Sequence, residues 1–302
     1  MAGLPSLRQL RYLLALSEQL NFTKAAESCF VGQSTLSSGL KELEETLGIR
    51  LVERDRQSVV ITEAGIEVVL RAKNLLAEAQ DLVDFASGSG KIMSGLLRMG
   101  VIPTIAPFLL PKVLPATRKQ FPDLRIALRE DLTKNLIARI KNHQLDFAVI
   151  ALPYDTEDLI VKELFDDEFW IVAKEDDPAL KGRYVQLPTQ MTERLLLLEE
   201  GHCLRDHSMR ACAPREVASV DGIEATSLLT LVQMVEFDLG IALLPEMAIQ
   251  AGILNNTHLV AKPLGASAPK RTIAIVARKT SARTAEFNIL GDFFAEILSR
   301  GI

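Results

Sequence analysis

An apolar repeat in residues 62–87 limits most strongly how this chain can fold. Its members follow one another at spacings of four and three, and they are Val68, Ala72, Leu75, Ala79, Leu82 and Ala86. This heptad spacing is typical of a helix that packs along a second helix. Thr62 can cap the first turn, where Glu63 suits the helix dipole. We expect one long helix whose repeat, the dimer seam, contacts the same helix of a second subunit.

The alternative for this helix is that it packs on its own domain. The Ser- and Gly-rich residues 87–90 that follow it favour a flexible connection to the rest of the chain. We therefore expect residues 62–90 to form a linker and dimerisation helix with a hinge.

Residues 5–61 have the pattern of a compact helical domain. Leu36, Leu40 and Leu43 repeat at helical spacing, and Gly32 permits a tight turn just before them. Two short helices joined by such a turn and packed on an earlier helix form a helix-turn-helix. Residues 50–62 then have the pattern of a small hairpin, or wing.

The outward face of the second helix predicts a DNA contact. It carries Gln33, Ser34, Thr35, Ser37, Ser38 and Lys41, and the expected wing adds Arg54 and Arg56. Such side chains can reach base edges and phosphates. The alternative is an ordinary solvated face, because residues 1–60 hold seven Lys and Arg against seven Asp and Glu, and the whole chain has a net charge of -5. The prediction of double-stranded DNA as a partner therefore depends on geometry rather than on a basic field.

Residues 91–302 alternate apolar runs with helical stretches. We expect strands at 96–102, 125–130, 146–152, 169–174, 194–200, 240–245 and 271–278, and helices at 106–121, 136–145, 227–238 and 284–300. This order indicates an α/β region with a largely parallel sheet. About 210 residues suffice for two subdomains around a cleft. The whole chain is thus expected to be a multidomain α+β protein.

The polar stretch GHCLRDHSMRAC, residues 201–212, holds two of the three cysteines. So few cysteines, with no signal segment and no apolar run of membrane length, predict a reducing cytoplasm and no membrane partner. There Cys203 and Cys212 would be thiols. A reactive cysteine needs a lowered pKa. Positive charge or hydrogen-bond donors could come from His202, Arg205, His207 and Arg210.

Several alternatives for this stretch stay open. Both cysteines could be inert core thiols, as we expect for Cys29 in an amphipathic helix. A metal could be held by His202, Cys203, His207 and Cys212, although the spacing is not a familiar zinc pattern, and we expect no metal. The cysteines could be incidental to a cleft that binds a small organic effector. A thiol peroxidase is a further alternative, but an enzyme would not need a DNA-binding unit. We therefore expect no enzymatic activity.

The segment NFTKAAESCFVGQSTLSSGLKELEETLGIRLVERDRQSVVITEAG resembles the winged helix-turn-helix of LysR-type transcriptional regulators. Its A-A-E, Q-S-T-L-S, L-E-x-x-L-G, L-x-E-R and T-x-A-G elements fall in order at the family spacing, although Ser34 stands where a proline is common. The resemblance covers the whole chain. It implies a homodimer or homotetramer and a regulatory domain, 91–302, like periplasmic binding proteins. Subdomain I would span about 91–164 plus 269–302, and subdomain II about 165–268.

Within that family, EEGHCLRDHSMRAC followed by EATSLLTLVQMV is similar to the hydrogen peroxide sensors. That resemblance implies that Cys203 reacts with peroxide and that Cys212 resolves the product. It implies a peroxide pocket lined or supported by Thr104, Thr133, His202, Arg205, Asp206 and Arg271. His207 and Arg210 depart from the pattern inside the cysteine loop. Hydrogen peroxide would be the signal, with no cofactor, and a cellular thiol reductant and RNA polymerase would be further partners.

Peroxide chemistry at this stretch would act as a switch. Oxidised Cys203 would be a sulfenic acid, which condenses with a second thiol to give a disulfide. Thr104 and Thr133 could position the peroxide and hydrogen-bond its departing oxygen. Along a continuous helix Cys203 and Cys212 would lie about 13 Å apart. A disulfide needs Cα atoms about 4.4–6.8 Å apart, so oxidation would have to rebuild a helical segment.

Overall fold

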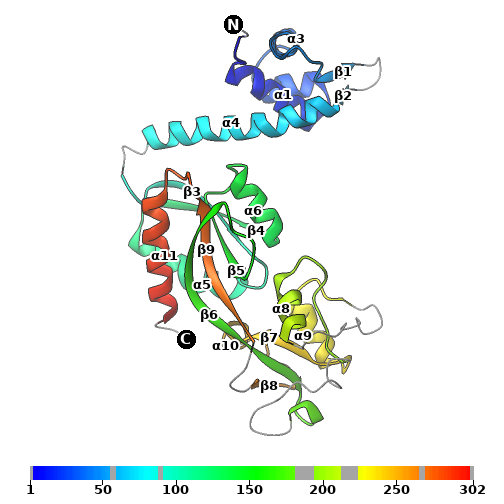
Figure 1. The fold of residues 1–302 in the computed structure, drawn as a ribbon, viewed down its shortest axis with the longest axis vertical. Coiled ribbons are helices and arrows are strands. Elements are labelled where there is room, and N and C mark those ends of the chain that lie inside the picture. Colours follow the sequence, from blue (N-terminus) through cyan, green and yellow to red (C-terminus); the bar gives the residue numbers. More distant parts are fainter. Residues whose placement is uncertain are drawn as a thin grey trace. The chain divides into compact units, whose positions relative to one another are not determined.

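A computed structural model describes residues 3–54, 59–87, 91–180, 194–211, 224–264 and 269–299 (Figure 1). The chain divides into two compact units. One comprises residues 1–90 with 142–144, and the other comprises residues 91–141 with 145–302.

The first unit begins with three helices and a two-stranded wing. These elements are α1 (Leu7–Gln19), α2 (Phe22–Ser28), α3 (Gln33–Leu47), β1 (Val52–Arg54) and β2 (Val59–Ile61), the last two being antiparallel. Ser6 and Gln9 form a reciprocal capping box that starts α1. Gly39 lets α3 approach α1 closely, because a Cβ there would lie 2.8 Å from the Tyr12 ring. The expected helix-turn-helix is thus present.

The long helix α4 (Glu63–Ser87) follows the wing. The Thr62 hydroxyl accepts the Gly65 N–H at 2.9 Å, as expected for an N-cap. Val68 and Ala72 pack against the core of the three-helix domain, and Ala72 is only 1% exposed. The expectation that the whole seam faces a second subunit is therefore wrong for Ala72. The heptad pattern could not separate it from the other members, because a single helix can use one stripe for two different partners.

The second unit is built on a seven-stranded sheet. Its strands are β3 (Gly95–Val101), β4 (Leu124–Glu130), β5 (Phe147–Leu152), β6 (Leu159–Lys174), β7 (Ala242–Pro245), β8 (Leu259–Pro263) and β9 (Lys270–Arg278). The order is β4-β3-β5-β9-β6-β7, and β8 also pairs with β6. Only the β3–β4 and β3–β5 pairs are parallel. The expected largely parallel sheet is thus wrong, because β9 inserts between β5 and β6 and runs opposite to both.

Helices and turns connect and cover these strands. They are α5 (Ala106–Gln120), α6 (Thr133–Lys141), the short helix η1 (Pro178–Leu180), α8 (Cys203–Ala211), α9 (Leu228–Glu236), α10 (Glu246–Gln250) and α11 (Thr284–Ser299). The strand expected at 194–200 is not formed. Residues Leu195 and Leu198 make only isolated bridges, to Ile241 and Ala225. The run is apolar because it is buried, and an apolar run alone does not show whether its backbone pairs with a neighbouring strand.

Two hydrophobic cores give the second unit two subdomains. The first core draws on β3, β5, α5, α6, β9 and α11, and the second on α8, α9, β7 and the end of β6. The 16-residue strand β6 is shared: its first part pairs with β9, and its last part pairs with β7 and β8 (Figure 1). The subdomain limits near 164 and 269 stay a prediction.

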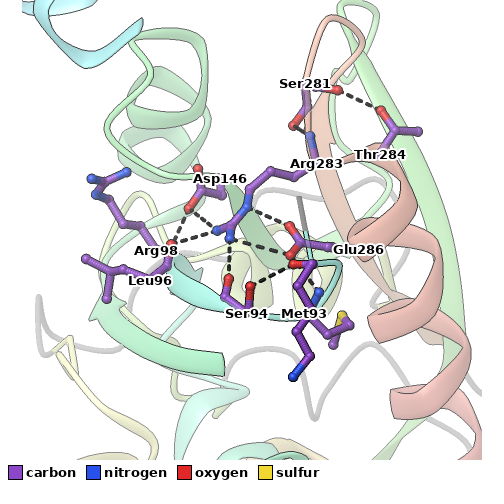
Figure 2. Close-up of polar contacts among 10 residues, drawn as sticks. Met93, Ser94, Leu96, Arg98, Asp146, Ser281, Arg283, Thr284 and Glu286 are labelled. Atoms are coloured by element: carbon purple, nitrogen blue, oxygen red, sulfur yellow. Dashed lines mark hydrogen bonds and ion pairs between the residues drawn. The ribbon is translucent and has the colours of Figure 1, made fainter. Parts of the chain in front are cut away.

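A polar network fixes the start of the second unit (Figure 2). Arg283, just before α11, donates to the carbonyl oxygens of Leu96 at 2.7 Å and Ser94 at 3.0 Å. Its Nε lies 2.6 Å from Glu286, which also accepts the Met93 N–H. One side chain therefore ties the entering strand β3 to the last helix of the chain.

Candidate functional site

Cys203 is the first residue of α8, at the meeting of the two cores. Gly201, two residues earlier, has a φ of +95°, which a side chain would strain. The turn at Gly201 starts the helix so that Leu204 is buried in the second core, while Cys203 packs partly buried against the first. The sequence GHCL thus places a thiol between the subdomains.

Arg271 is the cation of this site. It lies on β9, its side chain is 0% exposed, and its Nη1 donates to Thr104 Oγ1 at 2.8 Å. Its Nη2 donates to the Thr104 carbonyl oxygen at 3.1 Å. The other side of the guanidinium faces Asp167, whose Oδ2 accepts from Nε at 3.0 Å and from Nη2 at 2.9 Å. The Phe169 ring centroid lies 5.9 Å from the guanidinium carbon.

The surroundings of Cys203 raise the pKa of its thiol. Burial is the main cause. The charge of Arg271, and hydrogen bonds with Thr104 and Arg271, oppose this rise, whereas the charge of Asp206 adds to it. The expectation of a lowered pKa is therefore wrong for this conformation. It gave weight to cations near in sequence and could not include burial.

His202 and Arg205 do not bring positive charge to the thiol, and the side chains of His207 and Arg210 lie outside the described residues. Burial lowers the pKa of His202, although Glu199 partly opposes this, so the imidazole is neutral near pH 7. Arg205 turns to the Leu198 carbonyl oxygen at 2.9 Å and to the Glu224 carboxylate at 2.6 Å. Arg205 thus anchors α8 to the segments around Leu198 and Glu224 of the same chain.

The remaining predicted pocket residues differ in their exposure to solvent. Asp206 is exposed on α8. Thr133 is buried at the start of α6, and among the described residues its hydroxyl has no hydrogen-bond partner. Cys212 and Arg56 lie outside the described residues. The structure thus joins Thr104, Arg271 and Cys203.

A cleft of about 650 Å³ lies beside this cluster. Thr104 and His202 line it together with apolar side chains from both subdomains, among them Phe108, Leu228 and Ile253. Its charged lining residues are Glu130, Asp131 and Glu199, and no Lys or Arg appears among the described residues around it. The cleft can therefore hold a neutral or cationic organic molecule better than an anion.

The predicted DNA face on α3 and part of the dimer seam are at the surface, whereas the side chains of Arg54 and Ala86 lie outside the described residues. Gln33, Ser34, Thr35, Ser38 and Lys41 are exposed on α3, and Ser37 is half-buried. Arg54 ends β1. On α4, Leu75 is 48% and Leu82 is 69% exposed, and Ala79 is half-buried, so an apolar surface remains available there. The positions of Val68 and Ala86 in a dimer stay a prediction.

Two residues of the cluster were missed by sequence reasoning. Asp167 pairs with Arg271 across β6 and β9, and Met247 donates its N–H to Asp167 Oδ1 at 3.0 Å. The available signal was an acidic pair, Asp166 and Asp167, directly before an apolar strand. It was overlooked because the strand was expected to begin at 169, after both carboxylates.

No helix in the described part of the chain is long and apolar enough to cross a membrane. Nor do the described residues include three or more His, Cys, Asp or Glu side chains grouped as metal ligands would be.

Comparison with known proteins places this site in a family. Residues 7–66 match the bacterial regulatory helix-turn-helix of the lysR family, and residues 91–299 match the LysR substrate binding domain. The chain belongs to the LysR family of transcriptional regulators. Both the predicted family and the predicted fold class are confirmed. Members of this family bind DNA and form oligomers, so DNA and further copies of the chain are its partners.

Similar proteins span the whole chain. The HTH-type transcriptional regulator EstR of Acinetobacter baylyi is 44% identical over 298 residues, 98% of each protein. A hydrogen peroxide-inducible genes activator of Dickeya chrysanthemi is 38% identical, covering 96% of this chain and 95% of that protein. The solved structure of a full-length OxyR variant from Pseudomonas aeruginosa has a TM-score of 0.75 at 32% identity, covering 97% and 98% of the two chains. This LysR-family regulator is therefore related to peroxide-inducible activators.

Proposed function

We propose that this regulator senses hydrogen peroxide by oxidation of Cys203 and a disulfide between Cys203 and Cys212. The observation that carries the proposal is the cluster at the start of α8, where a buried arginine donates to a threonine hydroxyl and both groups favour the thiolate of one cysteine. Isolated core thiols have no such donors. The similarity to peroxide-inducible activators supports the same assignment.

The chemical step uses the donors of this cluster. The Cys203 sulfur attacks one peroxide oxygen, the O–O bond breaks, and the thiol proton leaves with the other oxygen as water. Thr104 and Arg271 donate hydrogen bonds that stabilise the charge developing on the departing oxygen. The resting thiol keeps its proton and is therefore a weak nucleophile toward simple electrophiles. Peroxide reacts because Thr104 and Arg271 stabilise its departing oxygen, a stabilisation that other electrophiles do not receive.

The switch follows from where Cys203 lies. A sulfenic acid at Cys203 condenses with Cys212. Because residues 203–211 are helical in the structure, a disulfide to Cys212 requires this segment, and the chain to about 222, to rebuild. The rebuilt segment changes packing between subunits and hence the spacing of the DNA-binding pairs at antioxidant genes. In a reducing cytoplasm, a cellular thiol reductant resets the switch, and RNA polymerase responds to the DNA-bound form.

The first experiment is peptide mapping of reduced protein after about one equivalent of hydrogen peroxide. The expected product has lost two hydrogens and carries a Cys203–Cys212 bridge. Cys203→Ser should abolish the peroxide response while leaving DNA binding intact. Cys212→Ser should stop at the sulfenic acid or over-oxidise. Unmodified thiols in the wild-type protein, or a normal oxidation-dependent footprint from Cys203→Ser, would overturn the proposal.

A small organic effector in the cleft is the second candidate function. The cleft volume and its mostly apolar lining favour such an effector. The name of EstR describes a transcriptional regulator and does not mention peroxide. Its carboxylates favour neutral or cationic effectors. Operator-DNA binding titrated with an aromatic amine and with the matching carboxylic acid, in reduced protein, tests this. A change in DNA affinity without oxidation would support it, and no change with either compound would remove it.

A further inference from the structure

Asp167 and Arg271 form a cross-strand pair that faces inward. Their Cα atoms are direct partners in the β6–β9 register, and both side chains are almost fully buried. Asp167 Oδ2 accepts two hydrogen bonds from Arg271, and Oδ1 accepts the Met247 N–H. Protein donors on two sides therefore hold the carboxylate.

The form of this contact decides which nitrogen faces the thiol site. Asp167 engages Nε and Nη2, so Nη1 is left to donate to Thr104 Oγ1. Both of these hydrogen bonds end on Asp167 Oδ2, so the guanidinium cannot rotate without losing them. Asp167 therefore sets the orientation of the cation that Cys203 contacts.

The pair also limits the positive potential at Cys203. The carboxylate of Asp167, at hydrogen-bond distance from Arg271, offsets part of the attraction of the guanidinium for a thiolate nearby. Among the described side chains, the charged groups around the thiol are Arg271 from β9, Asp206 on its own helix and, behind Arg271, Asp167 from β6. His202, the residue directly before Cys203, is neutral near pH 7. Cys203 thus receives hydrogen bonds from Arg271 but only part of its charge.

We propose that Asp167 is a positioning residue that restrains the general reactivity of Cys203 and reserves it for peroxide. This inference rests on the proposed function in naming peroxide as the favoured electrophile. Without Asp167, the full charge of Arg271 would favour the thiolate, and its donors would no longer be held toward the site. The thiol would become more reactive toward simple alkylating agents and would gain less toward peroxide.

Asp167→Asn tests the inference in a protein whose only thiol is Cys203, obtained with Cys29→Ser and Cys212→Ser. Asparagine offers one acceptor and one donor arm, so it cannot accept from both Arg271 and the Met247 N–H. The assay measures iodoacetamide alkylation against pH by intact mass. The midpoint should move to lower pH. Lowering the pKa of the thiol by about one increases the thiolate fraction at pH 7 roughly tenfold, but it also makes the thiolate a weaker nucleophile. The net result should be about three- to fourfold faster alkylation at pH 7.

Peroxide provides the second readout. The ratio of the peroxide rate constant to the iodoacetamide rate constant should fall in Asp167→Asn. A parent protein that does not react with peroxide would overturn the proposed function, whereas the alkylation profile would still test the effect of Asp167. The two failures are therefore distinguishable.

Asp166→Asn is the matched control. Asp166 is adjacent on the same strand, but it pairs with Lys270 and Thr272 at the surface. Its alkylation profile should equal that of the parent protein. An unchanged or higher midpoint in folded Asp167→Asn, or an equal shift in Asp166→Asn, would overturn the inference.

A second pair of variants applies if Asp167→Asn does not fold. Arg271→Gln leaves a buried carboxylate, while Arg271→Gln combined with Asp167→Asn leaves neither charge. The double variant should alkylate faster than Arg271→Gln, because the unpaired carboxylate disfavours a nearby thiolate. Equal rates would show that the charge of Asp167 does not act on Cys203, and would overturn the inference.

Discussion

Replacing Arg271 with methionine should destabilise the regulatory domain by about 4 kcal/mol. The arginine is fully buried, and its hydrogen bonds include two to Asp167 and two to Thr104. Its loss leaves the Asp167 carboxylate, 1% exposed, with the Met247 N–H as its donor among the described residues. An uncompensated buried charge of this kind costs roughly 3–5 kcal/mol. Methionine keeps much of the apolar volume, so a cavity adds little.

Urea unfolding followed by the fluorescence of Trp170 measures this loss. Trp170 is the single tryptophan of the chain and lies on β6, three residues after Asp167. With a denaturant slope of about 3 kcal/mol/M, the midpoint should fall by roughly 1.3 M. The double variant Arg271→Met with Asp167→Leu should recover most of the loss, because an apolar replacement of a whole buried ion pair is often neutral. Equal losses in both variants, or less than about 1 kcal/mol in Arg271→Met, would refute the charge-burial argument.

His202 should make the regulatory domain sensitive to acid, because burial lowers the pKa of its imidazole in the folded state. Below about pH 6.5 the unfolded state therefore binds more protons than the folded state. The stability of the domain is complete above that pH and falls on acidification. Urea midpoints from pH 7 to pH 5 should show a flatter slope in His202→Gln, and an identical slope would exclude this assignment. Arg283→Met should cost about 2–3 kcal/mol through its lost charged hydrogen bonds, whereas Arg129→Met, which removes an exposed ion pair, should cost less than about 1 kcal/mol. Thermal unfolding compares the two, and similar losses would contradict the prediction. Lys41→Ala should weaken binding to duplex DNA for all sequences alike and reduce the salt slope by about 1, as titrations at several salt concentrations would reveal; an unaltered slope would place Lys41 away from the phosphates.

Local sequence patterns were sufficient where a structure depends on near neighbours. Thr62 caps α4 by accepting a hydrogen bond from the backbone three residues later, as expected, and Gly32 precedes α3 where the turn was expected. The same holds for the amphipathic helices of the first unit, whose periodicity states directly which face is buried. The family motifs lie in this local part of the chain, so the DNA-binding fold could be predicted in order and nearly to the residue.

Pairings between distant segments could not be predicted in this way. The antiparallel insertion of β9 depends on a strand more than 100 residues after β5, and no local pattern encodes it. Ala72 repeats with the seam, yet it is buried within its own unit.

The sequence by itself determined the family, the helix-turn-helix and the polar stretch that carries Cys203. Only the tertiary structure decided the chemistry around Cys203. Burial, which raises the pKa of its thiol, and Arg271, which opposes that rise, come from elements remote in sequence. Asp167, which holds Arg271, is visible only once β6 and β9 are in register. Hydrogen bonds and charges act over a few ångströms in space, and the chain brings these groups within that range only by folding.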